Sequence, residues 1–299
     1  MAGPSPDGTP DASPGTRFRA LLERPGAVVL PGVSDALTAR LAVGAGFEAV
    51  YATGAGIANT LLGVPDVGLT TMTELVDQVA RITTAVDVPV IADIDTGFGN
   101  AINARRAVIE FERAGVAGIQ IEDQVFPKRC GHFSGKEIIP LPEMLAKLQA
   151  VLEARRDPSL VVIARTDALA VEGFDAAVER GRAFAAAGAD VVFIEAPVRI
   201  EELQVLPGLV PAPLLANMVE GGRTPLYGAD ELAAMGYRIV LFANTAMRVG
   251  ARAIRDALTE LRMTGDSRPI QDRMLSWEDR QALVGLPEIE ALEARYRVD

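Results

Sequence analysis

Short runs rich in Val, Ile and Leu recur along the chain, and most are followed by a segment with helical periodicity. We place eight of these runs at residues 27–32, 48–54, 89–95, 117–123, 160–167, 189–196, 213–218 and 237–244. Between them lie amphipathic segments at residues 35–45, 73–84, 101–114, 142–154, 175–187 and 229–235. Apolar runs that alternate strictly with helices are typical of a parallel sheet covered by helices.

Eight strand–helix units predict a closed (β/α)₈ barrel, the TIM barrel, rather than an open doubly wound sheet. The chain has 299 residues, and such a barrel uses about 250. The Gly-x-Gly-x-x-Gly fingerprint of dinucleotide-binding sheets does not follow the first run. We therefore expect a catalytic barrel domain at residues 16–263, preceded by a disordered tail at residues 1–15 that is rich in Pro, Gly, Ser and Asp.

The end of the chain exceeds what a barrel needs. A long helix is expected at residues 245–263, and a further helical stretch near residues 287–296. We interpret residues 264–299 as a helical extension that is exchanged between the subunits of a homo-oligomer, either a dimer or a tetramer.

Composition excludes several classes of partner. A net charge of −11 argues against nucleic acid, because phosphate binding needs clustered Lys and Arg. The longest uncharged apolar stretch, residues 203–219, contains Pro207, Pro211 and Pro213 and is predicted as a loop plus a strand, not a membrane span. The N-terminus lacks the features of a signal peptide. A single cysteine excludes an internal disulfide and fits a reducing compartment, so we expect a cytoplasmic protein.

Polar side chains end nearly every predicted strand. In a barrel of this kind, catalytic groups come from the C-terminal ends of the strands and the loops after them. Burying so many charged groups without a cation would cost a large free energy. The candidates at these ends are Tyr51, Thr53, Asp93, Asp95, Gln120, Glu122, Arg165, Glu195 and Asn217.

Three of these carboxylates predict a metal site. Asp93 and Asp95 are two residues apart in a strand and face the same side, while Glu122 ends the next strand. Such a set suits a hard divalent cation, and we expect Mg²⁺, with Mn²⁺ as the alternative. Capping of the following helices explains one such Asp equally well, but not three on neighbouring strands.

The only cysteine and the only histidine lie together in the loop Lys128-Arg129-Cys130-Gly131-His132. A lone cysteine is more often a small buried hydrophobe, but this one follows a strand end in a polar loop. Thiolate ligation of a hard cation is disfavoured. We therefore interpret Cys130 as a group that transfers a proton or acts as a nucleophile.

The sequence resembles the isocitrate lyase/phosphoenolpyruvate mutase superfamily from about residue 18 to residue 263. The strongest match is Glu-Asp-Gln-Val-Phe-Pro-Lys-Arg-Cys-Gly-His at residues 122–132, a signature of the lyase branch. Supporting matches lie at residues 51–55, 63–66, 93–99, 164–167 and 215–222.

The resemblance implies a role for each matching position. The backbone N–H groups of Thr53, Gly54 and Ala55 would hold the carboxylate of a small 2-oxo acid. Asp95 would ligate the metal directly, Asp93 and Glu122 directly or through water, and Asp66 and Gln120 would support the metal's waters. Arg165, Glu195 and Asn217 would bind the substrate. Lys128, Cys130 and His132 would belong to a mobile gating loop with Cys130 as the general acid, and Tyr51 would act at the substrate hydroxyl.

The implied activity is a Mg²⁺-dependent carbon–carbon lyase. It would cleave a small 2-hydroxy di- or tricarboxylate, of the 2,3-dimethylmalate, citramalate or 2-methylisocitrate type, by retro-aldol chemistry to pyruvate or a related 2-oxo acid. The same motifs resemble carboxyphosphonoenolpyruvate mutase, and oxaloacetate hydrolysis or decarboxylation is a neighbouring activity. A barrel without catalytic activity is a further alternative, and the carboxylates and Cys130 argue against it.

Three positions depart from the pattern of the lyases. Gln120 stands where many members have His, and it cannot titrate. Phe133 stands where 2-methylisocitrate lyases tend to have a polar or basic residue, which favours an alkylated malate over a tricarboxylate. Residues 242–248, Phe-Ala-Asn-Thr-Ala-Met-Arg, look more like the mutase branch.

Overall fold

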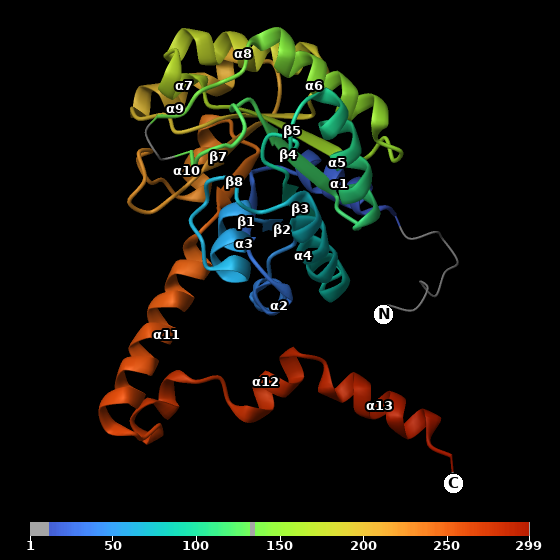
Figure 1. Cartoon of the computed structure of the whole chain (residues 1–299), viewed down its shortest axis with the longest axis vertical. Helices are drawn as coiled ribbons and strands as arrows, with labels where there is room; N and C mark the ends of the chain where they lie inside the picture. Colours follow the sequence, from blue (N-terminus) through green and yellow to red (C-terminus); the bar gives the residue numbers. More distant parts are fainter. Residues whose placement is uncertain (1–11, 132–134, 299) are drawn as a thin grey trace.

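The computed structural model describes residues 12–131 and 135–298. Eight parallel strands close into a barrel in chain order (Figure 1). They are β1 (Val28–Val33), β2 (Val50–Ala52), β3 (Val90–Asp93), β4 (Gly118–Glu122), β5 (Val161–Thr166), β6 (Val191–Ile194), β7 (Leu214–Asn217) and β8 (Ile239–Phe242). The predicted (β/α)₈ barrel is confirmed, and each observed strand lies within or one residue beyond its predicted run.

Alternation along the strands divides the apolar side chains into two cores. In β5, Val162 and Ala164 pack in the outer core against the helices, whereas Val161 and Ile163 belong to the core inside the barrel. Because successive side chains of a strand point to opposite faces, Arg165 continues the inner set at the C-terminal end of its strand. The apolar filling of the barrel therefore gives way to polar side chains at one end.

Helices cover the outside of the barrel (Figure 1). The described helices before the C-terminal extension are α1 (Pro14–Glu23), α2 (Ala36–Gly44), α3 (Gly54–Ile57), the π-helical turn η1 (Ala58–Leu62), α4 (Met72–Ala85), α5 (Ala101–Arg113), α6 (Leu141–Ala154), α7 (Ala168–Val171), α8 (Phe174–Ala186), α9 (Ile200–Leu209) and α10 (Ala229–Met235). The first of them begins at Pro14, two residues before the predicted start of the barrel domain.

The predicted loop at the start of residues 203–219 is wrong, because α9 continues to Leu209 with Pro207 inside it. A proline lacks the N–H that would bond the carbonyl four residues earlier. That carbonyl belongs to Leu203, and it accepts a hydrogen bond from the Tyr237 hydroxyl at 3.1 Å. A side chain from a distant segment thus replaces the missing donor.

The end of the chain leaves the barrel (Figure 1). Helix α11 (Thr245–Thr264) is followed by the 3₁₀ turn η2 (Arg268–Arg273), α12 (Trp277–Leu283) and α13 (Leu286–Tyr296). The extension contacts α2, where Arg40 Nη1 donates to Leu283 O at 3.0 Å. Among the described residues, no helix is both long enough and apolar enough to cross a membrane.

Candidate active site

The predicted polar residues meet at the C-terminal mouth of the barrel. On β4, Ile119 and Ile121 pack outward, so Gln120 and Glu122 face inward. Strand register places Asp93 beside Gln120 and Glu122 beside Arg165. A cavity at this mouth is lined by the predicted residues Tyr51, Thr53, Ala55, Asp66, Asp93, Gln120, Lys128, Cys130, Arg165, Glu195 and Asn217.

Lys128 lies among the carboxylates. Its side chain is 5% exposed, and its Nζ is 2.9 Å from Asp95 Oδ1 and forms a second ion pair with Asp66. Burial lowers the pKa of the Lys128 ammonium, but the surrounding carboxylates, Asp95 first among them, outweigh burial and raise it well above its usual value. Lys128 therefore stays charged and offsets part of the negative charge at the mouth.

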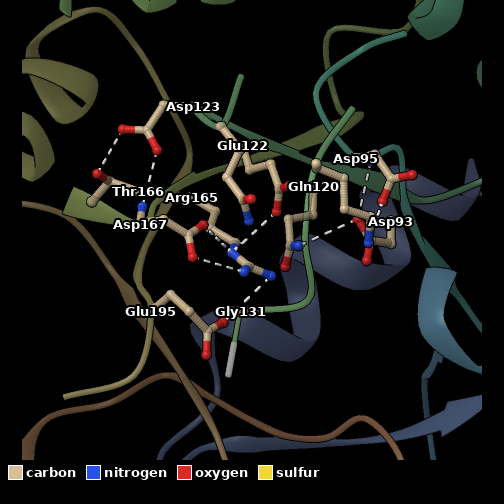
Figure 2. Close-up of polar contacts among 12 residues, drawn as sticks. Asp93, Asp95, Gln120, Glu122, Asp123, Gly131, Arg165, Thr166, Asp167 and Glu195 are labelled. Atoms are coloured by element: carbon tan, nitrogen blue, oxygen red, sulfur yellow. Dashed lines mark hydrogen bonds and ion pairs between the residues drawn. The ribbon is translucent and has the colours of Figure 1, made fainter. Parts of the chain in front are cut away.

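Arg165 is enclosed by three carboxylates (Figure 2). Its Nε is 3.0 Å from Asp167 Oδ2 and 3.3 Å from Glu122 Oε2, and its Nη1 is 3.4 Å from Glu195 Oε2. The guanidinium also lies over the Phe193 ring, 5.3 Å from its centroid. These contacts fix the guanidinium plane, so Arg165 can present its donors to a substrate carboxylate without reorganisation.

The predicted convergence of Asp93, Asp95 and Glu122 needs a correction. Within residues 12–131 and 135–298, no three acidic, His or Cys side chains stand in a ready-made metal-binding arrangement. The reason is that Glu122 turns toward Arg165 and Asp95 toward Lys128. The sequence pattern located the carboxylates on neighbouring strands, but it could not reveal that Asp95 and Glu122 each have a cation beside them.

The residues nevertheless fit a hard divalent cation. A side chain added at Gly54 would lie 3.2 Å from Asp93 Oδ2 and 3.4 Å from Asp95 Oδ1, so both carboxylates line the space beside this glycine. Oε1 of Glu122 and Oε1 of Gln120 are buried and, among the described residues, accept no hydrogen bond. Mg²⁺ could bind such buried oxygen atoms directly, or its bound waters could donate hydrogen bonds to them.

Burial of these acidic side chains close to one another raises their pKa values. Burial, followed by repulsion from Asp95, raises the pKa of Asp93 to about 6. Burial likewise raises the pKa of Asp95, and it raises that of Glu122 well above its ordinary value although Arg165 opposes the shift. A bound divalent cation would favour the ionised forms of all three.

The predicted carboxylate-binding segment follows β2. The Thr53 side chain caps α3 by accepting from Gly56 N at 3.4 Å, and a Cβ at Gly54 would press on Asp93 and Asp95, which lie 3.2 and 3.4 Å from its position. The backbone of residues 53–55 therefore borders the same cavity as the carboxylates. Its role in holding a substrate carboxylate stays a prediction.

Tyr51 is 2% exposed and lines the cavity. Burial, and then the nearby Asp93 carboxylate, raise the pKa of its hydroxyl well above 10. The hydroxyl therefore keeps its proton at neutral pH. It can donate a hydrogen bond to a substrate oxygen, but it cannot serve as a base.

Cys130 is half-buried and lies where two hollows meet. It borders the inner cavity together with Arg165 and Glu195, and a second, more open cavity beside α11 together with Asn244 and Arg248. This position lets its thiol reach a molecule in the inner cavity from the entrance side. His132, the other predicted loop residue, and Phe133 lie outside the described residues.

Two buried side chains were not assigned to the site from the sequence. Asp167 holds Arg165 by two hydrogen bonds, at 3.0 and 3.1 Å, and Lys136 contacts Asp167 Oδ1 at 2.6 Å. Arg165 and Lys136 together lower the pKa of Asp167, although burial opposes them. Asp167 follows the end of a strand, and this position could have indicated that it belongs to the site. Nothing in the sequence near Lys136 indicates that its side chain lies at the mouth of the barrel.

The chain is similar to enzymes that act on small carboxylic acids. The family model for phosphoenolpyruvate phosphomutase matches residues 18–262. A 2,3-dimethylmalate lyase of Eubacterium barkeri is 46% identical over 94% of this chain and 97% of its own length. A 2-methylisocitrate lyase of Aeropyrum pernix is 45% identical over 94% of this chain and 90% of its own.

A solved structure adds information on the metal. Phosphonopyruvate hydrolase in complex with oxalate and Mg²⁺ has a TM-score of 0.86 and 32% identity, covering 95% of this chain and 99% of its own. It shows a small dicarboxylate and a divalent metal together on a protein of this fold.

Proposed function

Because the chain belongs to the phosphoenolpyruvate mutase/isocitrate lyase superfamily, we propose that it is a Mg²⁺-dependent carbon–carbon lyase for a small 2-hydroxy dicarboxylate of the 2,3-dimethylmalate type. One observation carries the proposal. The cavity is lined by Asp93, by the fixed cation of Arg165 and by the Cys130 thiol, and Asp95 and Glu122 contact its lining residues Lys128 and Arg165. These are the groups needed to bind a 2-oxo acid fragment and to protonate the fragment that departs from it.

Asp93, Asp95 and Glu122 would hold the metal, with Asp66 and Gln120 supporting its waters. Mg²⁺ would supply a positive charge at the 2-oxygen and 1-carboxylate of the substrate. Lys128, beside Asp95 and Asp66, would share these carboxylates with the metal. A site of this composition stabilises negative charge that develops on the 2-oxo acid fragment.

The substrate would lie between Arg165 and the 53–55 backbone. Residues 53–55 would receive its carboxylate, Arg165 would bind the same fragment from the opposite wall, and Asn217 would bind the distal carboxylate. The Asn217 Oδ1 atom is buried and, in the described part of the chain, accepts no hydrogen bond. A polar ligand in the cavity would therefore complete the hydrogen bonding of this side chain.

The reaction is a retro-aldol cleavage. A base in the cavity takes the proton of the 2-hydroxyl, the C2–C3 bond breaks as the C2–O bond becomes a carbonyl, and the electron pair of the broken bond stays on the departing acid as its enolate. The Cys130 thiol then gives its proton to C3. For 2,3-dimethylmalate this yields pyruvate and propionate. The Tyr51 hydroxyl, which keeps its proton, would donate a hydrogen bond to the 2-oxygen throughout.

A substrate panel tests the proposal. Purified protein with Mg²⁺ is incubated with 2,3-dimethylmalate, citramalate, 2-methylisocitrate, oxaloacetate and phosphonopyruvate, and the products are followed by NMR. We expect pyruvate from a 2-hydroxy acid and loss of turnover with EDTA. Turnover of oxaloacetate alone would replace the proposal by a hydrolase, and turnover of phosphonopyruvate alone by a C–P bond enzyme.

We further propose that the extension is exchanged between subunits of a homo-oligomer. Helix α11 buries none of its residues in the chain itself. Large apolar side chains are exposed along one face of it at spacings of four and three residues, with Ile254 at 62%, Leu258 at 60% and Leu261 at 39%. An apolar stripe of this length on a helix that leaves its own barrel supports contact with another subunit.

A further inference from the structure

The loop that carries Cys130 is built on two arms that pair with each other. Val125 N donates to Glu137 O at 2.9 Å, and Ile139 N donates to Asp123 O at 2.8 Å. An antiparallel bridge between Gln124 and Ile138 lies between these bonds. The base of the loop is therefore fixed, but this pairing ends several residues before Cys130.

A buried amide fixes the residue before the cysteine. Gln124 is 1% exposed, and its side chain bonds the Arg129 backbone in both directions. Its Nε2 donates to Arg129 O at 2.8 Å, and Arg129 N donates to its Oε1 at 2.9 Å. Because the backbone N–H and the backbone carbonyl of Arg129 both bond the side-chain amide of Gln124, Arg129 has little freedom to shift or rotate.

A buried ammonium fixes the residue after the cysteine. The Lys136 side chain is 1% exposed, and its Nζ donates to Gly131 O at 2.6 Å and to Asp167 Oδ1 at 2.6 Å. Asp167 in turn accepts two hydrogen bonds from the Arg165 guanidinium. Gly131 itself packs so closely that an added Cβ would lie 2.7 Å from Glu195 Cδ.

Neutralisation of Asp167 does not by itself explain Lys136. The carboxylate already accepts two hydrogen bonds from Arg165, so one cation faces it before Lys136 adds a second. The second contact of the ammonium, to a backbone carbonyl, is what connects the loop to the substrate-binding wall. Loss of the Lys136 ammonium would leave both Gly131 O and Asp167 without this donor.

We propose that Gln124 and Lys136 are positioning residues that together hold Cys130 at its place beside Arg165, by fixing the peptides on either side of it. The role of Cys130 in turnover rests on the proposed function, but its position does not. The arrangement makes the loop register depend on Asp167, so the thiol and the Arg165 guanidinium are held by one connected set of hydrogen bonds.

Alkylation of Cys130 by iodoacetamide tests the proposal without any substrate, because this is the only cysteine of the chain. Mass spectrometry follows the rate in the full-length protein and in its Lys136→Met and Gln124→Leu variants. We expect each variant to change the alkylation rate at least about fivefold while the protein stays folded by circular dichroism. Lys147→Met is the matched control, because Lys147 is also buried, at 2%, but donates to Thr96 O.

Wild-type alkylation rates in both variants would overturn the proposal, and so would an equal change in Lys147→Met. If Lys136→Met fails to fold, Gln124→Leu still tests the proposal, because it removes both hydrogen bonds to the Arg129 backbone on the other side of the cysteine. With an active substrate in hand, kcat should fall about 10- to 100-fold in Lys136→Met with KM nearly unchanged, the scale for a misplaced catalytic group. A changed alkylation rate without any lyase activity would leave the positioning intact and refute only the proposed function.

Discussion

Lys128 Nζ lies 2.9 Å from Asp95 Oδ1, inside the group of carboxylates that we assign to the metal. A protein cation thus sits beside a proposed metal ligand, with Asp66 as its second partner. Two cations that share one carboxylate repel each other at short range. The metal affinity of this site therefore depends on where the Lys128 side chain lies.

Replacing Lys128 by Met should tighten Mg²⁺ binding while lowering turnover. Loss of the ammonium removes its repulsion of the metal, which at this separation is expected to change the dissociation constant by about tenfold. Isothermal calorimetry without substrate measures it, and Cys130→Ala is the control with unchanged affinity. Weaker binding in Lys128→Met would mean that the ammonium organises the ligands instead of competing with the metal.

Cys130→Ala should lower kcat by on the order of 10²-fold, the usual scale for loss of a general acid. Because the thiol lies at the cavity entrance and a thiol is a poor ligand for a hard cation, Mg²⁺ affinity should be unchanged. Steady-state kinetics and calorimetry on the same preparation separate the two effects. Turnover equal to that of the wild type would remove Cys130 from the mechanism.

The metal-free protein should lose stability as the pH rises through about 6. The pKa of Asp93 in the folded chain is about 6, above the ordinary value of 3.8. A carboxyl group with a raised pKa stabilises the fold while it is protonated, and this contribution is lost as the pH rises through the folded-state pKa.

Thermal melting below and above that pH, with EDTA or with Mg²⁺, measures the effect. We expect Tm to fall by roughly 5 °C in EDTA and to change much less with Mg²⁺, which binds the ionised form. Asp93→Asn should remove most of the pH dependence in EDTA. A profile in EDTA that is flat through pH 6 would show that Asp93 is already ionised there.

Gly131→Ala should impair catalysis more than stability. A Cβ at this position would lie 2.7 Å from Glu195 Cδ and would press on the Arg165 guanidinium. We expect kcat/KM to fall at least about tenfold, since displacement of positioned groups by about 1 Å is costly. Gly208→Ala is the matched control because nothing lies within 4 Å of its added Cβ. Equal kinetics in the two variants would contradict the packing described for Gly131.

Ile254→Glu should weaken subunit association. Ile254 on α11 is 62% exposed in the single chain, and a charge there opposes burial against another subunit. Light scattering after gel filtration should show a smaller species than the wild type. Ile102→Glu makes the same change at an isoleucine that is 72% exposed on α5 and should leave the assembly intact. If the assemblies of both variants have the same mass as the wild-type assembly, α11 does not form the interface between subunits.

Much of the site followed from the sequence because the catalytic groups of such a barrel lie where its strands end. Once β3, β4 and β5 were placed, Asp93, Gln120 and Arg165 were expected at the C-terminal ends of these strands, and all three line the cavity there. The partners of these groups were not predictable. The Lys128 contact with Asp66 joins residues separated by 62 positions, and it depends on how two loops fold over the mouth.

The wrong loop at the start of residues 203–219 has a similar cause. Pro207 was weighed by its local effect on a helix, but the Tyr237 hydroxyl satisfies the carbonyl that this proline leaves without a donor. In the same way, the link from Lys136 to Asp167 crosses from a loop to the end of a strand. Hydrogen bonds between segments that are distant in the sequence do not affect its hydrophobic periodicity, so they cannot be predicted from it.

The central claim is cleavage of a carbon–carbon bond with protonation of the departing fragment. NMR of the Mg²⁺-loaded protein with 2,3-dimethylmalate in D₂O tests it most directly. We predict equal amounts of pyruvate and of propionate that carries a single deuterium on the carbon next to its carboxylate, with no reaction in EDTA. Absence of pyruvate, while the same preparation turns over phosphonopyruvate or oxaloacetate, would contradict the account.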